Sequence, residues 1–116
     1  MVVIGYGPGI SHATAERFGR QGYSVALVAR NGERVTKGVD HLKSIGIDAR
    51  GYSADAQDPE SIRSAVAKIR SEMGPVSALL WTAFRSGDVK DLLATRPESV
   101  ERVFDIGVMG LLTCVQ

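Results

Sequence analysis

The stretch Val2-Val3-Ile4-Gly5-Tyr6-Gly7-Pro8-Gly9-Ile10-Ser11 decides the fold of this chain. A short apolar run breaks into three alternating glycines and then continues with the spacing of an amphipathic helix. This order predicts a strand, a tight turn and a helix, so that backbone N–H groups and the positive end of the helix dipole converge on one point. A pyrophosphate group can bind at such a point. Because glycines also mark ordinary loops and helix caps, a purely structural turn is the alternative.

Short apolar runs alternate with longer segments of helical period, which is typical of βαβ units around a parallel sheet. The sequence predicts strands over 2–4, 24–29, 48–53 and 76–82, and helices over 10–21, 33–45 and 59–73. The third helix has Asp58 as its N-cap and Pro59 at its first position. A fourth helix is expected to begin near Thr95, whose spacing to Glu98 fits a capping box. Residues 85–91 are predicted to form an open loop.

These elements predict one domain over residues 1–116, of the α/β class, with a Rossmann-like doubly wound parallel sheet. Right-handed crossovers place the four strands in the order 3-2-1-4, a truncated form of that architecture with helices on both faces. The expected ligand site is the crevice between the first and fourth strands, above their carboxyl ends.

The charge balance and the apolar pattern exclude several classes of partner. With 14 Lys+Arg against 13 Asp+Glu, the formal net charge is +1. The protein as a whole therefore has no strong positive electrostatic potential that would attract nucleic acid or an anionic membrane. No apolar run approaches the roughly 20 residues that cross a bilayer, and the N-terminus lacks a secretory pattern. Cys114 is the only cysteine, which excludes an internal disulfide, and its apolar helical surroundings indicate a core residue. We expect a cytoplasmic protein.

The glycine-rich turn resembles that of the short-chain dehydrogenase/reductase family, whose nucleotide loop runs Gly-x-x-x-Gly-x-Gly after the first strand. Gly5 and Gly9 match this pattern, whereas Ser11 replaces the third glycine. The resemblance extends along the chain and implies the amino-terminal, cofactor-binding portion of a nicotinamide-dependent oxidoreductase. The loop residues expected to contact the dinucleotide are Gly5, Tyr6, Gly7, Pro8, Gly9 and Ile10.

The end of the second strand bears on the choice between NADP and NAD. Family members that prefer NAD carry an acidic residue there, whereas this chain has Ala29 followed by Arg30. A carboxylate binds the ribose 2′-hydroxyl and repels a 2′-phosphate, whereas an arginine pairs with that phosphate. We therefore expect NADP, with NAD as the alternative. Asn31 is a further candidate contact, unless Arg30 is simply a solvated arginine and Asn31 only caps the second helix.

Two later segments supply the remaining candidate contacts. Ala54 and Asp55 resemble the family's segment at the adenine edge, and a turn-capping role for Asp55 is the alternative. After the fourth strand the family usually shows Asn-Asn-Ala-Gly, of which only the alanine remains here. The resemblance places Thr82, Ala83 and Phe84 beside the cofactor. Trp81 is expected in the core.

No catalytic residue is predicted. The resemblance assigns catalysis to a serine and a Tyr-x-x-x-Lys pair, and no tyrosine here has a lysine at that spacing: Tyr6, Tyr23 and Tyr52. Gly107 stands where the family has an asparagine that orders a water chain. No metal site is predicted either, because His12 and His41 lie on different predicted helices without a carboxylate cluster of ligand spacing. Both histidines are expected on solvated faces.

Three functional hypotheses remain open. The first is the NADP(H)-binding portion of a short-chain dehydrogenase-like oxidoreductase, which in the complete enzyme transfers hydride between nicotinamide and a carbonyl or alcohol. The second is a catalytically inactive nucleotide-binding or self-associating regulatory module, favoured by the departures at Trp81, Thr82, Phe84 and Gly107. The third is a domain that binds no cofactor and acts through protein contacts. The edge of the fourth strand and the apolar stripe of the last helix predict a homodimer or higher homo-oligomer.

Overall fold

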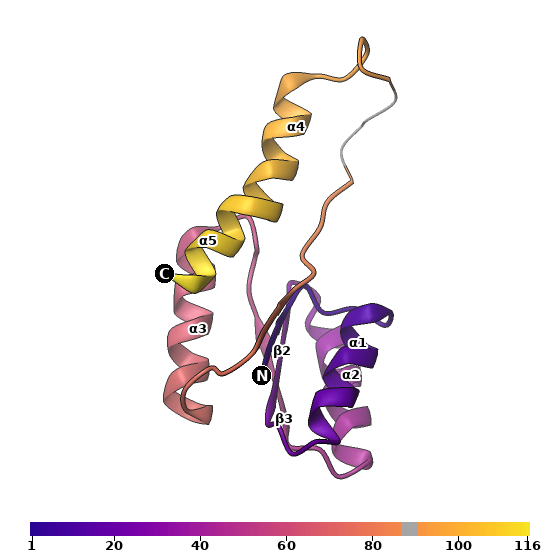
Figure 1. The fold of residues 1–116 in the computed structure, drawn as a ribbon, viewed down its shortest axis with the longest axis vertical. Helices are drawn as coiled ribbons and strands as arrows, with labels where there is room; N and C mark the ends of the chain where they lie inside the picture. Colours follow the sequence, from indigo (N-terminus) through magenta and orange to yellow (C-terminus); the bar gives the residue numbers. More distant parts are fainter. Residues whose placement is uncertain (87–90) are drawn as a thin grey trace.

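A parallel sheet of four strands forms the centre of the computed structural model, which describes residues 1–86 and 91–116 (Figure 1). The strands lie in the order β3-β2-β1-β4, and each neighbouring pair is parallel. They are β1 (Val2–Ile4), β2 (Val25–Ala29), β3 (Ala49–Ser53) and β4 (Leu79–Trp81). The predicted α/β class and the predicted order 3-2-1-4 are confirmed.

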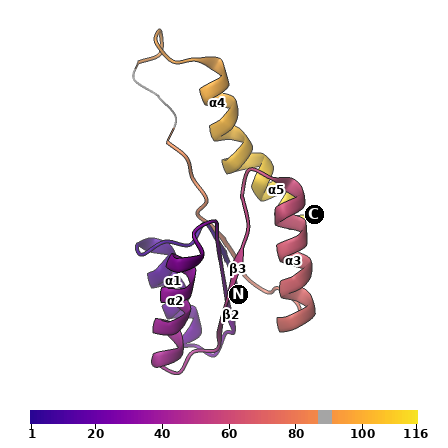
Figure 2. The same ribbon diagram turned by 180° about the vertical axis from the view of Figure 1, so that it is seen from behind.

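Helices cover both faces of the sheet (Figures 1 and 2). On one face lie α1 (Ile10–Gly19) and α2 (Gly32–Ser44), and on the other lie α3 (Pro59–Met73) and α5 (Gly110–Val115). Helix α5 packs on α3, whereas α4 (Pro97–Phe104) extends away from the sheet. Among the described residues, no helix is both long and apolar enough to cross a membrane.

The alternation of side chains along the strands divides the core into two layers. Val3 and Leu27 face the α1 and α2 side, where they pack with Leu42. Ile4 and Val28 face the α3 side, where they pack with residues that include Ala65 and Ile69. Both layers are needed because a parallel sheet is buried on its two faces.

The register places the carboxyl ends of three strands level with one another. Ile4, the last residue of β1, pairs with Val28 of β2 and with Trp81 of β4. The residues that follow these strand ends therefore meet at one edge of the sheet, which is where the sequence predicted the ligand crevice.

Several predicted boundaries need correction. Strand β4 spans Leu79–Trp81 rather than 76–82, because it pairs only with the three residues of β1. The predicted capping box is wrong: α4 begins at Pro97 after Arg96, and the Thr95 hydroxyl donates to the Asp91 carbonyl at 2.6 Å. The helix expected over 10–21 ends at Gly19, before Gly22, whose φ is +95°. The loop expected over 85–91 includes residues 87–90, which lie outside the described residues.

The last helix contains a break that the sequence analysis did not predict. A π-helical turn, η1 (Asp105–Met109), joins α4 to α5 and contains Gly107. Gly110 packs closely beyond this turn, since a Cβ atom there would lie 2.8 Å from the Trp81 ring and 2.8 Å from the Ala56 carbonyl oxygen. The small residue thus lets α5 approach both β4 and the loop after β3. Single π turns of this kind are frequent at functional sites.

Candidate functional site

A cavity of about 750 Å³ lies at the carboxyl ends of all four strands. Its lining comes from the end of β1, the end of β2, and the loops that follow β3 and β4. It includes these residues predicted to contact a cofactor: Gly5, Tyr6, Arg30, Asn31, Ala54, Asp55, Thr82, Ala83 and Phe84. The volume is in the range of small-molecule sites. The remaining candidates, Gly7, Pro8, Gly9 and Ile10, lie in the adjoining turn that leads into α1.

Gly5 makes the turn after β1 and touches the end of β4. Its φ is +90°, and a Cβ atom there would lie 2.2 Å from the Ala83 backbone nitrogen. Thr82 strengthens the same junction, because its hydroxyl donates to the carbonyls of Ile4 at 3.3 Å and Gly5 at 3.1 Å. The side chain of Thr82 is therefore engaged with β1, and its position at the rim of the cavity is fixed.

The rest of the glycine turn is closed by Ser11. The Gly7 N–H donates to Ser11 Oγ at 2.9 Å, and Ser11 Oγ donates in turn to the Gly7 carbonyl at 3.0 Å. The Gly7 N–H is therefore not free for an anion, and the first N–H groups of α1 are the donors that remain. Ser11 is buried beneath the turn.

Gly7 and Gly9 face open space, because a Cβ atom added at either would meet no atom within 4 Å. Neither glycine has a positive φ. Ile10 begins α1 and is 78% exposed. At Gly7, neither packing within the protein nor a positive φ requires glycine. Gly9, the N-cap of α1, has φ −96° and ψ −122°, which lie outside the common backbone regions of other residues.

The Tyr6 side chain turns away from the turn and into the layer between the sheet and α2. It is buried, and its ring fills the space over Gly38, where a Cβ atom would lie 2.2 Å from the Tyr6 hydroxyl oxygen. That hydroxyl is 2.9 Å from His12 Nδ1. Burial raises the pKa of Tyr6, and the Arg34 charge lowers it by a smaller amount. Only the backbone side of Tyr6 is available to the cavity.

Basic side chains line the cavity beyond β2. Arg30 is exposed directly after this strand, and Arg34 lies one turn into α2. Asn31 caps α2, since its side-chain oxygen accepts the Arg34 N–H at 3.0 Å. The capping role considered for Asn31 is therefore confirmed, and the residue lines the cavity as well. Arg34 was not among the predicted site residues, although its spacing of four from Arg30 places both near the start of one helix.

The loop after β3 is held by local hydrogen bonds. Asp55 Oδ1 accepts the Gln57 N–H at 2.9 Å, and the Asp55 N–H donates to Ser61 Oγ at 3.0 Å. Asp55 thus has the turn-capping role and still lines the cavity. The Ala54 N–H donates to the Ala29 carbonyl at 3.3 Å, which fixes this loop beside the end of β2.

The loop after β4 supplies a large exposed ring. Phe84 lines the cavity and is 77% exposed. Trp81 is partly buried and packs against the core, as predicted. Further lining residues that the sequence analysis missed include Arg85, Gln57 and Ile106. Ile106 belongs to η1, so only the three-dimensional path of the last helix brings it to the cavity.

Tyr52 and Tyr23 are both held by contacts within the protein. Burial and a 2.7 Å hydrogen bond to Glu72 raise the pKa of Tyr52 to about 12. Tyr23 packs edge-on against Phe18. Burial also raises the pKa of Cys114, which packs against the core on the α3 side. The packing of Cys114 against the core agrees with its prediction as a core residue.

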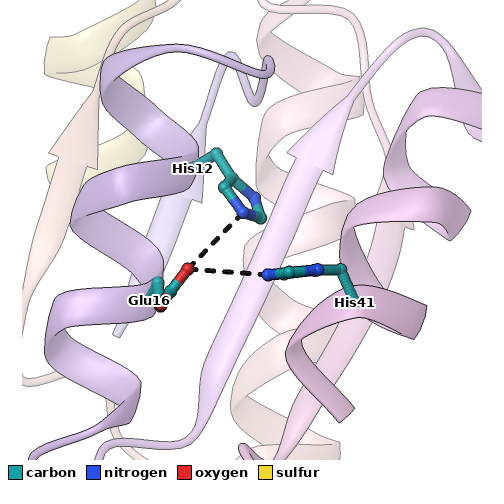
Figure 3. A group of neighbouring side chains, drawn as sticks. All are labelled: His12, Glu16 and His41. Atoms are coloured by element: carbon teal, nitrogen blue, oxygen red, sulfur yellow. Dashed lines mark ion pairs between the residues drawn. The ribbon is translucent and has the colours of Figure 1, made fainter. Parts of the chain in front are cut away.

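One part of the expectation for the two histidines needs correction, namely that no carboxylate lies at ligand spacing from them. His12 of α1 and His41 of α2 face one another with Glu16 between them (Figure 3), so a carboxylate lies at ligand spacing. A hydrogen bond from Arg20 is the largest cause that lowers the pKa of Glu16. The residues meet because α1 and α2 cover the same face of the sheet. The histidines are 29 residues apart in the sequence, so their spacing does not predict this contact.

Comparison with known proteins identifies the family. The family model described as short chain dehydrogenase matches residues 1–116. The 2,3-dihydro-2,3-dihydroxybenzoate dehydrogenase of Bacillus subtilis is 32% identical over 111 residues, which are 94% of this chain and 41% of that protein. The chain thus spans about two fifths of the length of the curated relatives it matches.

Solved structures give the same result. A xylitol dehydrogenase with bound NAD⁺ is 26% identical with a TM-score of 0.91, and the match covers 98% of this chain and 44% of that one. An actinorhodin polyketide ketoreductase variant with NADPH is also 26% identical, with a TM-score of 0.87 and the same coverage. With its full length matched by the family model and its fold shared with these enzymes, the chain belongs to the short-chain dehydrogenase family.

Proposed function

We propose that this chain is the cofactor-binding portion of an oxidoreductase and that it binds NADP(H) at the carboxyl ends of the strands. The carrying observation is the open space beside Gly7, where neither packing within the protein nor a positive φ requires glycine. A phosphate that approaches the backbone closely supplies a reason for glycine. The start of α1 adds a helix dipole and unpaired N–H groups at the same point.

The preference for NADP rests on the charges beyond β2. Arg30 and Arg34 line the cavity, and Ala29 rather than a carboxylate ends the strand. Two guanidinium groups favour the 2′-phosphate, which a carboxylate at this position repels. The relatives themselves include a ketoreductase with NADPH and a dehydrogenase with NAD⁺, so the preference comes from this chain's own residues.

Each part of the cavity receives one part of the dinucleotide in this proposal. The turn over Gly5, Tyr6, Gly7, Pro8, Gly9 and Ile10 holds the pyrophosphate, partly through backbone groups. Arg30 and Asn31 hold the adenosine ribose and its phosphate, and Ala54 and Asp55 lie at the adenine. Thr82, Ala83 and Phe84 border the second ribose. When bound, the nicotinamide supplies hydride exchange with a carbonyl or alcohol carbon.

The complete reaction is proposed for the longer enzyme to which the chain's relatives correspond. The family's serine and Tyr-x-x-x-Lys pair do not occur in these 116 residues, and the three tyrosines present have no such lysine. In this proposal the cofactor contacts come from this chain, and the chemical step uses residues of the longer enzyme. The single cysteine suits a reducing compartment such as the cytoplasm.

We also propose that two copies of the chain associate through the last helix. Val100, Phe104 and Leu112 are exposed apolar residues at spacings of four and eight along it. Apolar stripes of this kind are typical of interfaces. The formal net charge of +1 leaves little repulsion between two copies. Self-association would also fit a regulatory module without catalysis.

The test of the proposed function is calorimetric titration of the protein with NADPH and NADH. We expect tighter binding of NADPH, and we expect Arg30→Ala to weaken NADPH binding by about tenfold or more while changing NADH binding little. Arg63→Ala is the matched control, because Arg63 is an exposed arginine of α3 that does not line the cavity. No binding of either cofactor overturns the proposal. An equal loss for both cofactors overturns the NADP assignment.

A further inference from the structure

We propose that His12, Glu16 and His41 form a binding site for a divalent transition metal of the zinc type between α1 and α2 (Figure 3). One ligand atom from each residue lies within 4.8 Å of the other two. Two imidazole nitrogens and one carboxylate oxygen are a ligand set that zinc accepts. In the part of the chain that the structure describes, these residues are separate from the cavity at the strand ends.

The two distances from Glu16 to the histidines are close to those of a tetrahedral site. Glu16 Oε2 is 3.5 Å from His41 Nε2 and 3.8 Å from His12 Nε2. Ligands at about 2.1 Å from a tetrahedral zinc lie roughly 3.4 Å apart. All three ligand atoms lie within 4.8 Å of one another, and rotations of the partly exposed side chains close the remaining difference. His12 and Glu16 come from the same face of α1, four residues apart, and His41 approaches from α2 (Figure 3).

Neighbouring groups already orient two of the three ligands. The Tyr6 hydroxyl lies 2.9 Å from His12 Nδ1, and a partner at this nitrogen leaves Nε2 to bind a metal. Arg20 donates to Glu16 Oε1 at 2.9 and 2.7 Å, which holds that oxygen and turns Oε2 toward the imidazoles. Ligating histidines and carboxylates commonly have such partners. The arrangement therefore includes the hydrogen bonds that support a metal site.

The exposure of the three side chains allows a metal to enter. Their exposed fractions are 22% for His12, 28% for Glu16 and 50% for His41. Solvent can supply the fourth ligand. Magnesium is disfavoured because it prefers an all-oxygen octahedron. A bound zinc would link α1, which follows the glycine turn, to α2, which follows Arg30, and would hold the two helices in a fixed relation.

A metal-free explanation is that protonated imidazoles simply form ion pairs with Glu16. Titration with ZnCl2 followed by calorimetry, together with the visible absorption of the Co²⁺ complex, distinguishes the two explanations. We expect one Zn²⁺ per chain with micromolar or lower Kd, a tetrahedral Co²⁺ spectrum, and no binding of Mg²⁺ at this site. His41→Gln and Glu16→Gln should each weaken Zn²⁺ binding by at least about tenfold.

Asp40→Asn is the matched control, because Asp40 is exposed on α2 beside His41 and is not a member of the group. It should leave Zn²⁺ binding unchanged. Tyr6→Phe should weaken binding by about tenfold while the stoichiometry stays at one metal per chain. His41 is half exposed, so its variant should keep the far-UV circular dichroism of the parent protein. Absence of saturable Zn²⁺ binding, or binding that His41→Gln and Glu16→Gln both retain, overturns the proposal. Neither result depends on nicotinamide binding.

Discussion

Gly5 and Ala83 touch where β1 and β4 end: a Cβ atom on Gly5 would lie 2.2 Å from the Ala83 backbone nitrogen and 2.5 Å from its Cα. The contact joins the first turn of the chain to a segment 78 residues later. Backbone atoms rather than a flexible side chain lie against Gly5, so the contact cannot relax by a rotamer change. The edge of the sheet at which the cavity opens therefore depends on this glycine.

Gly5→Ala should destabilise the fold by about 3 kcal/mol or more, because a positive φ and an overpacked contact add their costs. Urea unfolding followed by circular dichroism measures this loss. Gly22→Ala is the matched control, since Gly22 also has a positive φ, +95°, but faces open space. It should cost about 1 kcal/mol. Equal losses for the two variants would mean that the contact with Ala83 contributes nothing.

Gly7→Ala should separate binding from folding. A methyl group at Gly7 meets no protein atom within 4 Å and φ there is not positive, so the free energy of unfolding should change by less than about 0.5 kcal/mol. The same methyl group stands where we propose that phosphate approaches the backbone. NADPH affinity, measured by calorimetry, should fall by about tenfold. Unchanged affinity would count against the proposed position of the pyrophosphate.

The elements could be predicted from the sequence because their signals are local. Val2 to Ile4 form a strand as predicted, and Asp58 caps α3, its side chain accepting the Glu60 N–H at 3.0 Å. The strand order followed from the handedness of the crossovers. The end of β4 was less predictable, because its ladder is limited by the length of β1 rather than by its own apolar run.

The parts of the site that the sequence did not predict depend on contacts between distant elements. Tyr6 belongs to the glycine turn, yet its side chain fits over Gly38 on α2. Ile106 reaches the cavity only through the path of the last helix. His12 and His41 meet because α1 and α2 share a face of the sheet. The spacing of residues in the sequence indicates which residues are neighbours within one helix or strand. These partners lie in different elements, so the spacing could not predict their contacts.

Asn31→Asp should test the two roles of this position. An aspartate accepts the Arg34 N–H as well as asparagine does and interacts favourably with the start of α2, so stability should be unchanged or slightly higher. Its negative charge should repel the 2′-phosphate. We expect calorimetry to give weaker NADPH binding, with NADH affected less. A variant that binds both cofactors as the parent does would remove Asn31 from the proposed site.

Tyr52 should make the fold sensitive to alkali. Its pKa is raised to about 12 from 10.0, by burial and by the Glu72 carboxylate. The phenol therefore keeps its proton in the folded state while the unfolded chain loses it above pH 10. The free energy of unfolding should keep its full value below pH 10. Between pH 10 and 12 it should fall by up to about 1.4 kcal/mol for each pH unit.

Tyr52→Phe tests this dependence, because it removes the titrating group and keeps the ring. Its free energy of unfolding should fall less steeply between pH 10 and 12 than that of the parent protein. Tyr23→Phe is the control, since Tyr23 is partly exposed and packs against Phe18. If the free energy of unfolding falls equally steeply with pH in Tyr52→Phe and in the parent protein, Tyr52 is not the cause of the loss of stability above pH 10.

The last helix should control the state of association. Phe104 and Leu112 are 53% and 44% exposed on it, and burying the exposed half of one such side chain stabilises an interface by about 1 kcal/mol. Light scattering at tens of micromolar should give the mass of a dimer or a larger assembly. Phe104→Asp should shift the mass toward the monomer, because a carboxylate then opposes an apolar surface. Arg102→Ala, an exposed position of α4 that does not line the hollow shared by Val100 and Phe104, should leave the mass unchanged. A parent protein that is monomeric throughout this range would show that the stripe does not bind a second copy.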